Sequence, residues 1–80
     1  MEISKKIVEL IKDTKSVYVP VKEDMDLYRD LDFDSLEFMQ LIINVEETFS
    51  ITLGLLEIDR CRRVEQLIKT VEGKLEGAGS

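Results

Sequence analysis

Apolar residues recur at helical spacing in separate segments of this 80-residue chain, and this pattern limits the fold more than any other feature. In residues 63–75 they occupy one helix face, at Val64, Leu67, Ile68, Val71 and Leu75. In residues 3–14 they do the same, at Ile3, Ile7, Leu10 and Ile11. An apolar residue every three or four positions is typical of an amphipathic helix, so we predict helices over both segments.

The rest of the chain completes an all-α fold. Residues 35–49 have a further helical face, and we expect this helix to end in the stretch before Gly54, where β-branched residues favour a break. Residues 55–61 suggest a short helix or turn. Residues 15–33 contain Pro20 and read as a long loop with one helical turn near residues 25–31. Apolar side chains would anchor that loop to a core, namely Val17, Val19, Met25, Leu27, Leu31 and Phe33. We predict a four-helix bundle with three main helices, one short helix and a long first loop. It would form a single domain over residues 1–76, with a flexible tail at 77–80.

Charge and size exclude several classes of function. The net charge of −6 disfavours nucleic acid and anionic membrane surfaces as partners. The acidity is concentrated in residues 23–47, where nine carboxylates face Arg29 alone, so a basic partner surface would be steered there. A chain of 80 residues has few side chains with which to build a catalytic cleft, so a self-sufficient enzyme is not expected.

Cysteine and histidine content narrows the chemistry further. Cys61 is the only cysteine and there is no histidine, which removes an intramolecular disulfide and a zinc site. We expect Cys61 to be a small buried hydrophobic residue. Asp30, Asp32 and Asp34 resemble the start of a calcium loop, but glycine at position six and glutamate at position twelve are missing. No segment resembles a signal peptide or a membrane span, so we expect a cytoplasmic protein without membrane insertion. We also expect a monomer.

Ser35 lies where the second helix should begin, and three interpretations apply to it. Asp34 with Glu37 three residues later forms a capping-box pattern, in which Ser35 is merely the first helical residue. A metal loop is the second interpretation, and it fails whether the loop starts at Asp30 or at Asp24, because neither start places glycine at position six and glutamate at position twelve. In the third, the serine hydroxyl is an attachment point, because backbone amides at a helix N-terminus stabilise an anionic group bound there. Nucleophilic catalysis would need a base, and no histidine is present.

The expected second helix has two apolar faces rather than one. The core face holds Phe38, Leu41, Ile42, Val45 and Phe49. Leu36, Met39 and Ile43 form a second stripe, interleaved with Gln40 and Glu47 and flanked by Glu37 and Glu46. Either the short helix or the long loop covers this stripe, or it is an exposed surface that docks partners.

Asp34-Ser35-Leu36 before an amphipathic helix ending in "VEETFSI" (residues 45–51) resembles the acyl carrier protein and phosphopantetheine-binding family. The likeness extends over most of the chain, through the helix order, the long loop and the last helix opening "RRVEQLI". It implies that Ser35, flanked by Asp34, is esterified with 4′-phosphopantetheine from coenzyme A by a holo-synthase (phosphopantetheinyl transferase). The thiol of that arm would hold acyl groups as thioesters and deliver them to partner enzymes in fatty-acid or polyketide-type biosynthesis. The carrier itself would not be an enzyme.

The resemblance also implies a recognition surface. In this family the second helix is the one that partner enzymes contact, which carries over here to Leu36, Glu37, Met39, Gln40, Ile43 and Glu47. The partners implied are the transferase, a ligase that loads acyl or aminoacyl groups, and downstream synthases or transferases. Side chains between the helices would line a space for an acyl chain, at Ile42, Val45, Leu67 and Ile68.

Three departures from the family pattern point to a specialised stand-alone carrier. Asp32 replaces a usual glycine and would be strained if the loop needs a positive φ there. Gln40 stands where an acid is common. Arg60, Arg62 and Arg63 make the third segment unusually basic, and they form either a solvated face or a contact for a specific acidic partner. An aminoacyl carrier, such as a D-alanyl carrier, is an alternative cargo class. The alternative from a functional class other than carriers is a helical module that binds a protein partner and carries no modification.

Overall fold

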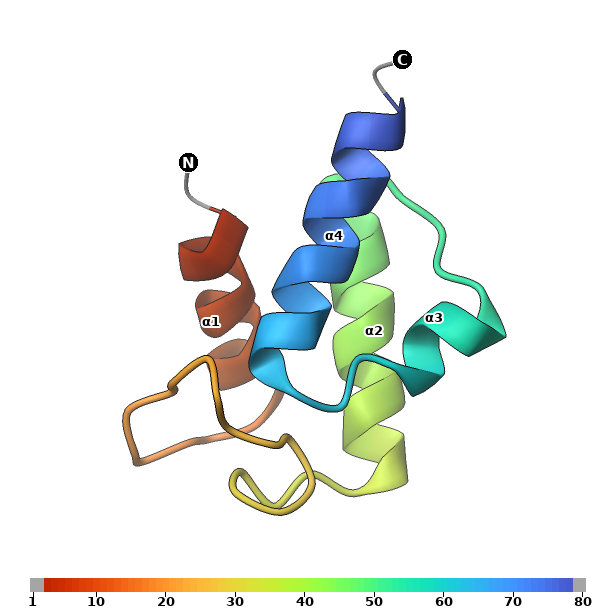
Figure 1. Ribbon diagram of the computed structural model, residues 1–80. Helices are drawn as coiled ribbons and strands as arrows, with labels where there is room; N and C mark the ends of the chain where they lie inside the picture. Colours follow the sequence, from red (N-terminus) through yellow and green to blue (C-terminus); the bar gives the residue numbers. More distant parts are fainter. Residues whose placement is uncertain (1–2, 79–80) are drawn as a thin grey trace.

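The three strongly patterned segments are helical in the computed structural model, which describes residues 3–78. Four helices and no strand occur within that range (Figure 1). Their bounds are α1 Ile3–Thr14, α2 Ser35–Phe49, α3 Leu55–Asp59 and α4 Val64–Ala78. The predicted all-α class, with three main helices, one short helix and a long first loop, is confirmed.

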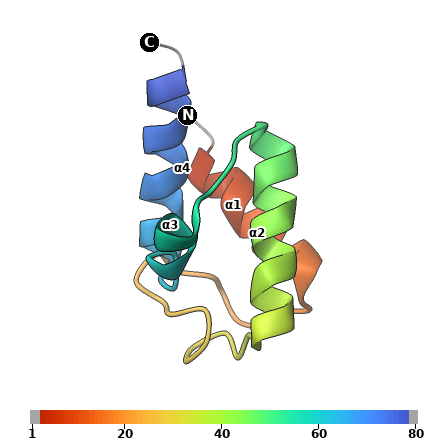
Figure 2. The ribbon, with the colours of Figure 1, turned by 90° about the vertical axis from the view of Figure 1, so that its right-hand side faces the viewer.

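The core forms where the apolar faces of the three long helices meet. α1 packs against both α2 and α4, and Figure 2 shows it between them. The fully buried side chains include Ile7 and Ile11 of α1, Leu41 and Val45 of α2, and Val64, Leu67 and Val71 of α4. Burying one such aliphatic side chain stabilises the fold by about 1.5–3 kcal/mol, so this seam is the main stabilising feature.

The long loop over residues 15–34 is fixed by a few buried side chains and by backbone hydrogen bonds. Leu27, Leu31 and Phe33 are buried in the core, whereas Val19 is 48% exposed, so its predicted role as an anchor is wrong. The backbone N–H of Leu27 donates to the carbonyl of Arg62 at 2.7 Å, and that of Val64 donates to the carbonyl of Met25 at 3.0 Å. These bonds attach the loop to the α3–α4 connection and to the first residue of α4.

The predicted helical turn in this loop is present over residues 26–31. The N–H of Asp30 donates to the carbonyl of Asp26 at 2.8 Å, which is the i to i+4 spacing of one helical turn. The Asp26 carboxylate accepts from the N–H groups of Tyr28 and Arg29 at 2.8 and 3.0 Å. The bond from Arg29 is the main cause that lowers the pKa of Asp26 below its usual value, and the nearby Arg62 adds to the effect.

The ends of the later helices differ from the sequence prediction. α3 ends at Asp59, so Cys61 lies after the helix rather than inside a segment that reaches residue 61. α4 continues to Ala78, so residues 77 and 78, which we expected in a flexible tail, are helical. No proline interrupts the sequence after residue 64, and the i to i+4 backbone bonds can therefore continue. Residues 79–80 of the expected tail lie outside the described residues.

Candidate functional site

Ser35 is the first residue of α2 and is exposed, as the capping pattern predicts. The N–H of Glu37 donates to Oδ1 of Asp34 at 2.8 Å, and the N–H of Asp34 donates to Oε1 of Glu37 at 3.0 Å. This reciprocal pair is the capping box, and it closes the first turn of α2 around Ser35. The Ser35 hydroxyl is therefore held at the positive end of a 15-residue helix while remaining open to solvent.

Asp32 precedes the site in a left-handed conformation, with φ of 58°. Only glycine adopts this region without strain, although aspartate tolerates it better than most residues. The sequence predicted strain at Asp32 if the loop requires a positive φ there, and the structure has that positive φ. The turn at Asp32 directs the chain so that Phe33 enters the core and Asp34 reaches the cap position.

Lys15, the first residue after α1, holds this turn against α2. Its Nζ donates to the carbonyl of Asp32 and to Oε1 of Glu37, the latter at 3.0 Å. The same Nζ lies 5.8 Å from the centre of the Phe33 ring. One cation thus stabilises both the strained turn and the capping box. The sequence reasoning missed Lys15, because these partners are 17 and 22 residues away and no local pattern connects them.

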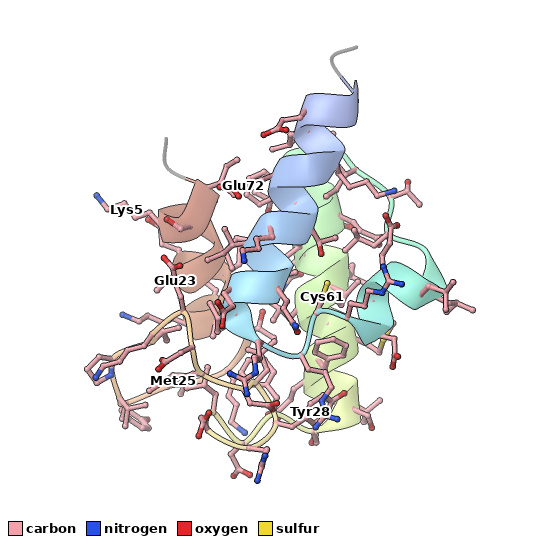
Figure 3. The ribbon with its side chains drawn as sticks, viewed as in Figure 1. Lys5, Glu23, Met25, Tyr28, Cys61 and Glu72 are labelled. Carbon is pink, nitrogen blue, oxygen red and sulfur yellow. The ribbon has the colours of Figure 1, made fainter. Side chains whose placement is uncertain are left out.

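A groove of about 390 Å³ opens beside Ser35, between the start of α2 and α3. Its lining combines apolar and charged side chains from four parts of the chain: Tyr28, Ser35, Phe38, Met39, Leu55, Ile58, Asp59 and Arg62. The rings of Tyr28 and Phe38 lie 5.3 Å apart at a tilt of 41°, and Tyr28 lies near the first turns of α2 (Figure 3). The serine hydroxyl therefore opens onto a partly apolar channel that extends towards α3.

The third helix forms one wall of this groove and is held by packing of Ile58 against the core and by polar contacts of Glu57. None of its residues is buried. Oε1 of Glu57 accepts from the N–H of Gly54 at 2.8 Å and pairs with Nζ of Lys74 on α4 at 2.9 Å. The bond from Gly54, followed by that from Lys74, lowers the pKa of Glu57 below its ordinary value. Glu57 therefore joins the short helix to α4.

Comparisons with known proteins agree with this geometry. A family model described as "Phosphopantetheine attachment site" matches residues 5–71. An acyl carrier protein of Petrotoga mobilis is 35% identical over 75 residues, which cover 92% of this chain and 88% of that protein. The chain belongs to the phosphopantetheine-binding family of acyl carrier proteins.

Two further comparisons extend the likeness over nearly the whole length. An acyl carrier protein of Amoebophilus asiaticus is 31% identical over 75 residues, covering 92% of this chain and 94% of that protein. The crystal structure of an acyl carrier protein from Thermotoga maritima superposes with a TM-score of 0.81 at 30% identity. That match covers 98% of this chain and 95% of the other.

Membership of this family sets the cofactor and the class of protein. The cofactor is 4′-phosphopantetheine, and the protein is a carrier rather than an enzyme. The residues present fit such a group. An exposed hydroxyl lies at a capped helix N-terminus, and the adjoining groove offers apolar walls together with one arginine. A phosphodiester suits the helix end, and an extended arm suits the groove.

The second apolar stripe of α2 is exposed and uncovered by α3 or the long loop. Leu36 is 81% exposed, and Met39 and Ile43 are each 43% exposed. Leu55 and Leu56 of α3 are also exposed, at 85% and 76%. We call these five residues the outer apolar strip. The alternative in which other elements cover the stripe is therefore wrong.

The polar residues predicted beside this strip have different surroundings. Gln40 and Glu47 are exposed, and Nε2 of Gln40 donates to Oδ1 of Asn44 at 3.0 Å. Glu37 is only partly exposed, because it serves both the capping box and the ion pair with Lys15. Glu37 is thus placed mainly to organise the site, while Gln40 and Glu47 face outward.

The remaining sequence candidates are located as follows. Cys61 is fully buried, as predicted, and burial raises the pKa of its thiol. Ile42, Val45, Leu67 and Ile68, the predicted lining of an acyl space, are all buried in the core. Within residues 3–78 no three His, Cys, Asp or Glu side chains are grouped as metal ligands. No helix in that range is both long and apolar enough to cross a membrane.

Proposed function

We propose that Ser35 is the attachment residue for 4′-phosphopantetheine and that the protein carries acyl groups for partner enzymes. The observation that supports this most directly is the exposed Ser35 hydroxyl at the capped start of α2, opening onto the groove towards α3. The relatives in Petrotoga mobilis and Amoebophilus asiaticus are named acyl carrier proteins, which favours acyl over aminoacyl cargo.

The attachment reaction needs only an accessible nucleophile from this chain. The Ser35 oxygen attacks the phosphorus of the phosphopantetheine half of coenzyme A, and a new P–O bond forms. The P–O bond to adenosine 3′,5′-bisphosphate breaks, the bisphosphate leaves, and the serine proton goes to a base of the transferase. This chain contributes position, because Asp34 and Glu37 fix the first turn and Lys15 fixes the preceding loop.

The bound arm supplies a terminal thiol that holds an acyl group as a thioester. The chain itself presents that arm to successive enzymes. We propose that the outer apolar strip, bordered by Gln40 and Glu47, is the surface to which the transferase, a loading ligase and downstream synthases dock. Met39 suits contact with several partners because its unbranched side chain adapts to different surfaces. The expected cytoplasmic location stays a prediction.

Intact-protein mass spectrometry tests the attachment. The purified chain is incubated with coenzyme A and a phosphopantetheinyl transferase of broad specificity, and a gain of about 340 Da is expected, the mass of the arm. Ser35→Ala should show no gain. Ser16→Ala, which removes another exposed serine, should show the full gain. A gain in Ser35→Ala, or none in the unmodified sequence, would refute the proposal.

A second experiment separates a carrier from an unmodified interaction module. The carrier requires both Ser35 and the strip, so Met39→Glu should slow loading of the arm by a partner ligase while leaving the fold intact. A module that only binds one partner would lose binding with Met39→Glu and keep full function with Ser35→Ala. Loading assays with fatty acids and with D-alanine then identify the cargo, and preferential loading of the amino acid would favour the aminoacyl alternative.

A further inference from the structure

Arg62 has a fixed backbone beside the groove. Its carbonyl accepts from the N–H of Leu27 at 2.7 Å. On either side of it, the N–H of Cys61 donates to Ile58 at 3.0 Å and that of Val64 donates to Met25 at 3.0 Å. Cys61 and Val64 are also fully buried. The point from which the Arg62 side chain leaves the backbone is therefore set by the core.

The guanidinium of Arg62 lies over an aromatic ring and forms no ion pair with a carboxylate of residues 3–78. Its central carbon lies 4.8 Å from the centre of the Tyr28 ring, and Tyr28 in turn contacts the Phe38 ring of α2. Among residues 3–78 this guanidinium forms neither an ion pair within 4.0 Å nor a side-chain hydrogen bond. The N–H groups of this guanidinium are therefore available to an anion.

Ser35 and Arg62 line the same groove. The carboxylate in this lining is that of Asp59, and the other members are Tyr28, Phe38, Met39, Leu55 and Ile58. An anion on the Ser35 oxygen would thus meet one arginine and the amide end of α2. Arginine binds phosphate oxygens through two parallel N–H bonds, which a lysine at the same place cannot reproduce.

We propose that Arg62 is a positioning residue that binds the phosphodiester on Ser35 and directs the arm into the groove along Met39, Leu55 and Ile58. This proposal rests on attachment at Ser35. Neither neighbouring arginine is placed for the role. The Arg63 side chain donates to the carbonyl of Asp24 at 3.3 Å, and Arg60 is not part of the groove lining.

Phosphorus NMR of the modified protein tests this directly, since the arm contains a single phosphate. The variants are Arg62→Gln, which removes the charge, and Arg62→Lys, which keeps it. Arg60→Gln is the matched control, since it removes an exposed arginine two residues away. Circular dichroism verifies the fold of each variant, and the mass gain of about 340 Da verifies its modification.

We expect the phosphorus resonance of Arg62→Gln to move towards the position seen for the modified protein unfolded in urea, because the amide end of α2 still contacts the phosphate. Arg60→Gln should keep the resonance of the original sequence, and Arg62→Lys should fall between the two. Identical resonances in Arg62→Gln and Arg60→Gln, with normal mass gains, would overturn the role of Arg62 and leave attachment at Ser35 intact. Absence of the mass gain from every variant would overturn both proposals.

Discussion

Replacing Lys15 by methionine should destabilise the protein by about 1.5 kcal/mol, because one side chain supports both the Asp32 turn and the capping box. Methionine keeps the apolar stem beside the Phe33 ring, so the change removes the ammonium group and little packing. The substitution therefore isolates the two polar contacts of Nζ.

The magnitude follows from the exposure of each contact. The side chains of Lys15 and Glu37 are 23% and 33% exposed, so their ion pair at 3.0 Å is partly screened by water. We assign it about 0.5–1 kcal/mol, the upper part of the range for surface pairs. The hydrogen bond from Nζ to the Asp32 carbonyl is charge-assisted but also open to solvent, and we assign it a similar amount, about 0.5–1 kcal/mol.

Urea unfolding followed by circular dichroism measures the effect. A loss of about 1.5 kcal/mol should lower the midpoint by about 1 M, given the urea dependence typical of small domains. In thermal unfolding the same loss corresponds to a fall of about 6–12 °C. In a Glu37→Gln background the cost of Lys15→Met should shrink by the ion-pair share, about 0.5–1 kcal/mol.

Lys12→Met is the matched control. Lys12 is an exposed lysine in the last turn of α1, three residues before Lys15, and its loss changes the net charge equally. Its favourable interaction with the helix dipole limits the expected cost to about 0.5 kcal/mol. If Lys15→Met destabilises the protein no more than Lys12→Met does, Lys15 does not organise the attachment loop and the reasoning is wrong.

Three other predictions concern the cap, a titrating carboxylate and the cysteine. Asp34→Ala should cost about 1 kcal/mol in urea unfolding and Asp34→Asn much less, because asparagine also caps helices. Hydrogen bonds lower the folded pKa of Asp26, so its contribution to stability is full above its unfolded pKa of about 3.9 and is lost as the pH falls through the folded value. The stability difference between the original protein and Asp26→Asn should therefore be greatest near neutral pH and vanish in strong acid; a difference independent of pH would contradict this. Burial raises the pKa of Cys61, so a thiol reagent at pH 8 should react slowly with the folded protein and rapidly in urea, and equal rates would show that the thiol is accessible.

Features that depend on neighbours in sequence could be predicted from the sequence. The bounds of α1 and α2 follow from apolar spacing and, for α2, from the cap at Asp34 with Glu37 three residues later. The burial of Cys61 follows from the general behaviour of a lone cysteine. The question of strain at Asp32 arose from the residue type, whereas its φ of 58° came from the structure.

Some predictions failed where local preference and packing disagree. Val19 has a β-branched apolar side chain, yet it lies on an outer part of the loop and stays half exposed. Residues 77 and 78 look like a tail by composition, yet they continue α4. The path of the surrounding chain decides both the exposure of Val19 and the helical state of residues 77 and 78.

The sequence by itself determined the helices, the cap at Asp34 and the exposed serine that follows it, because each depends on residues at most a few positions apart. Only the tertiary structure brought Lys15 to Asp32 and Glu37, and Arg62 to Tyr28 beside the groove. Those contacts join residues 17 to 34 positions apart, and their formation depends on how three amphipathic helices bury their faces together. Periodicity shows that a face is buried without specifying which distant loop packs against it, and that choice decides the surroundings of Ser35.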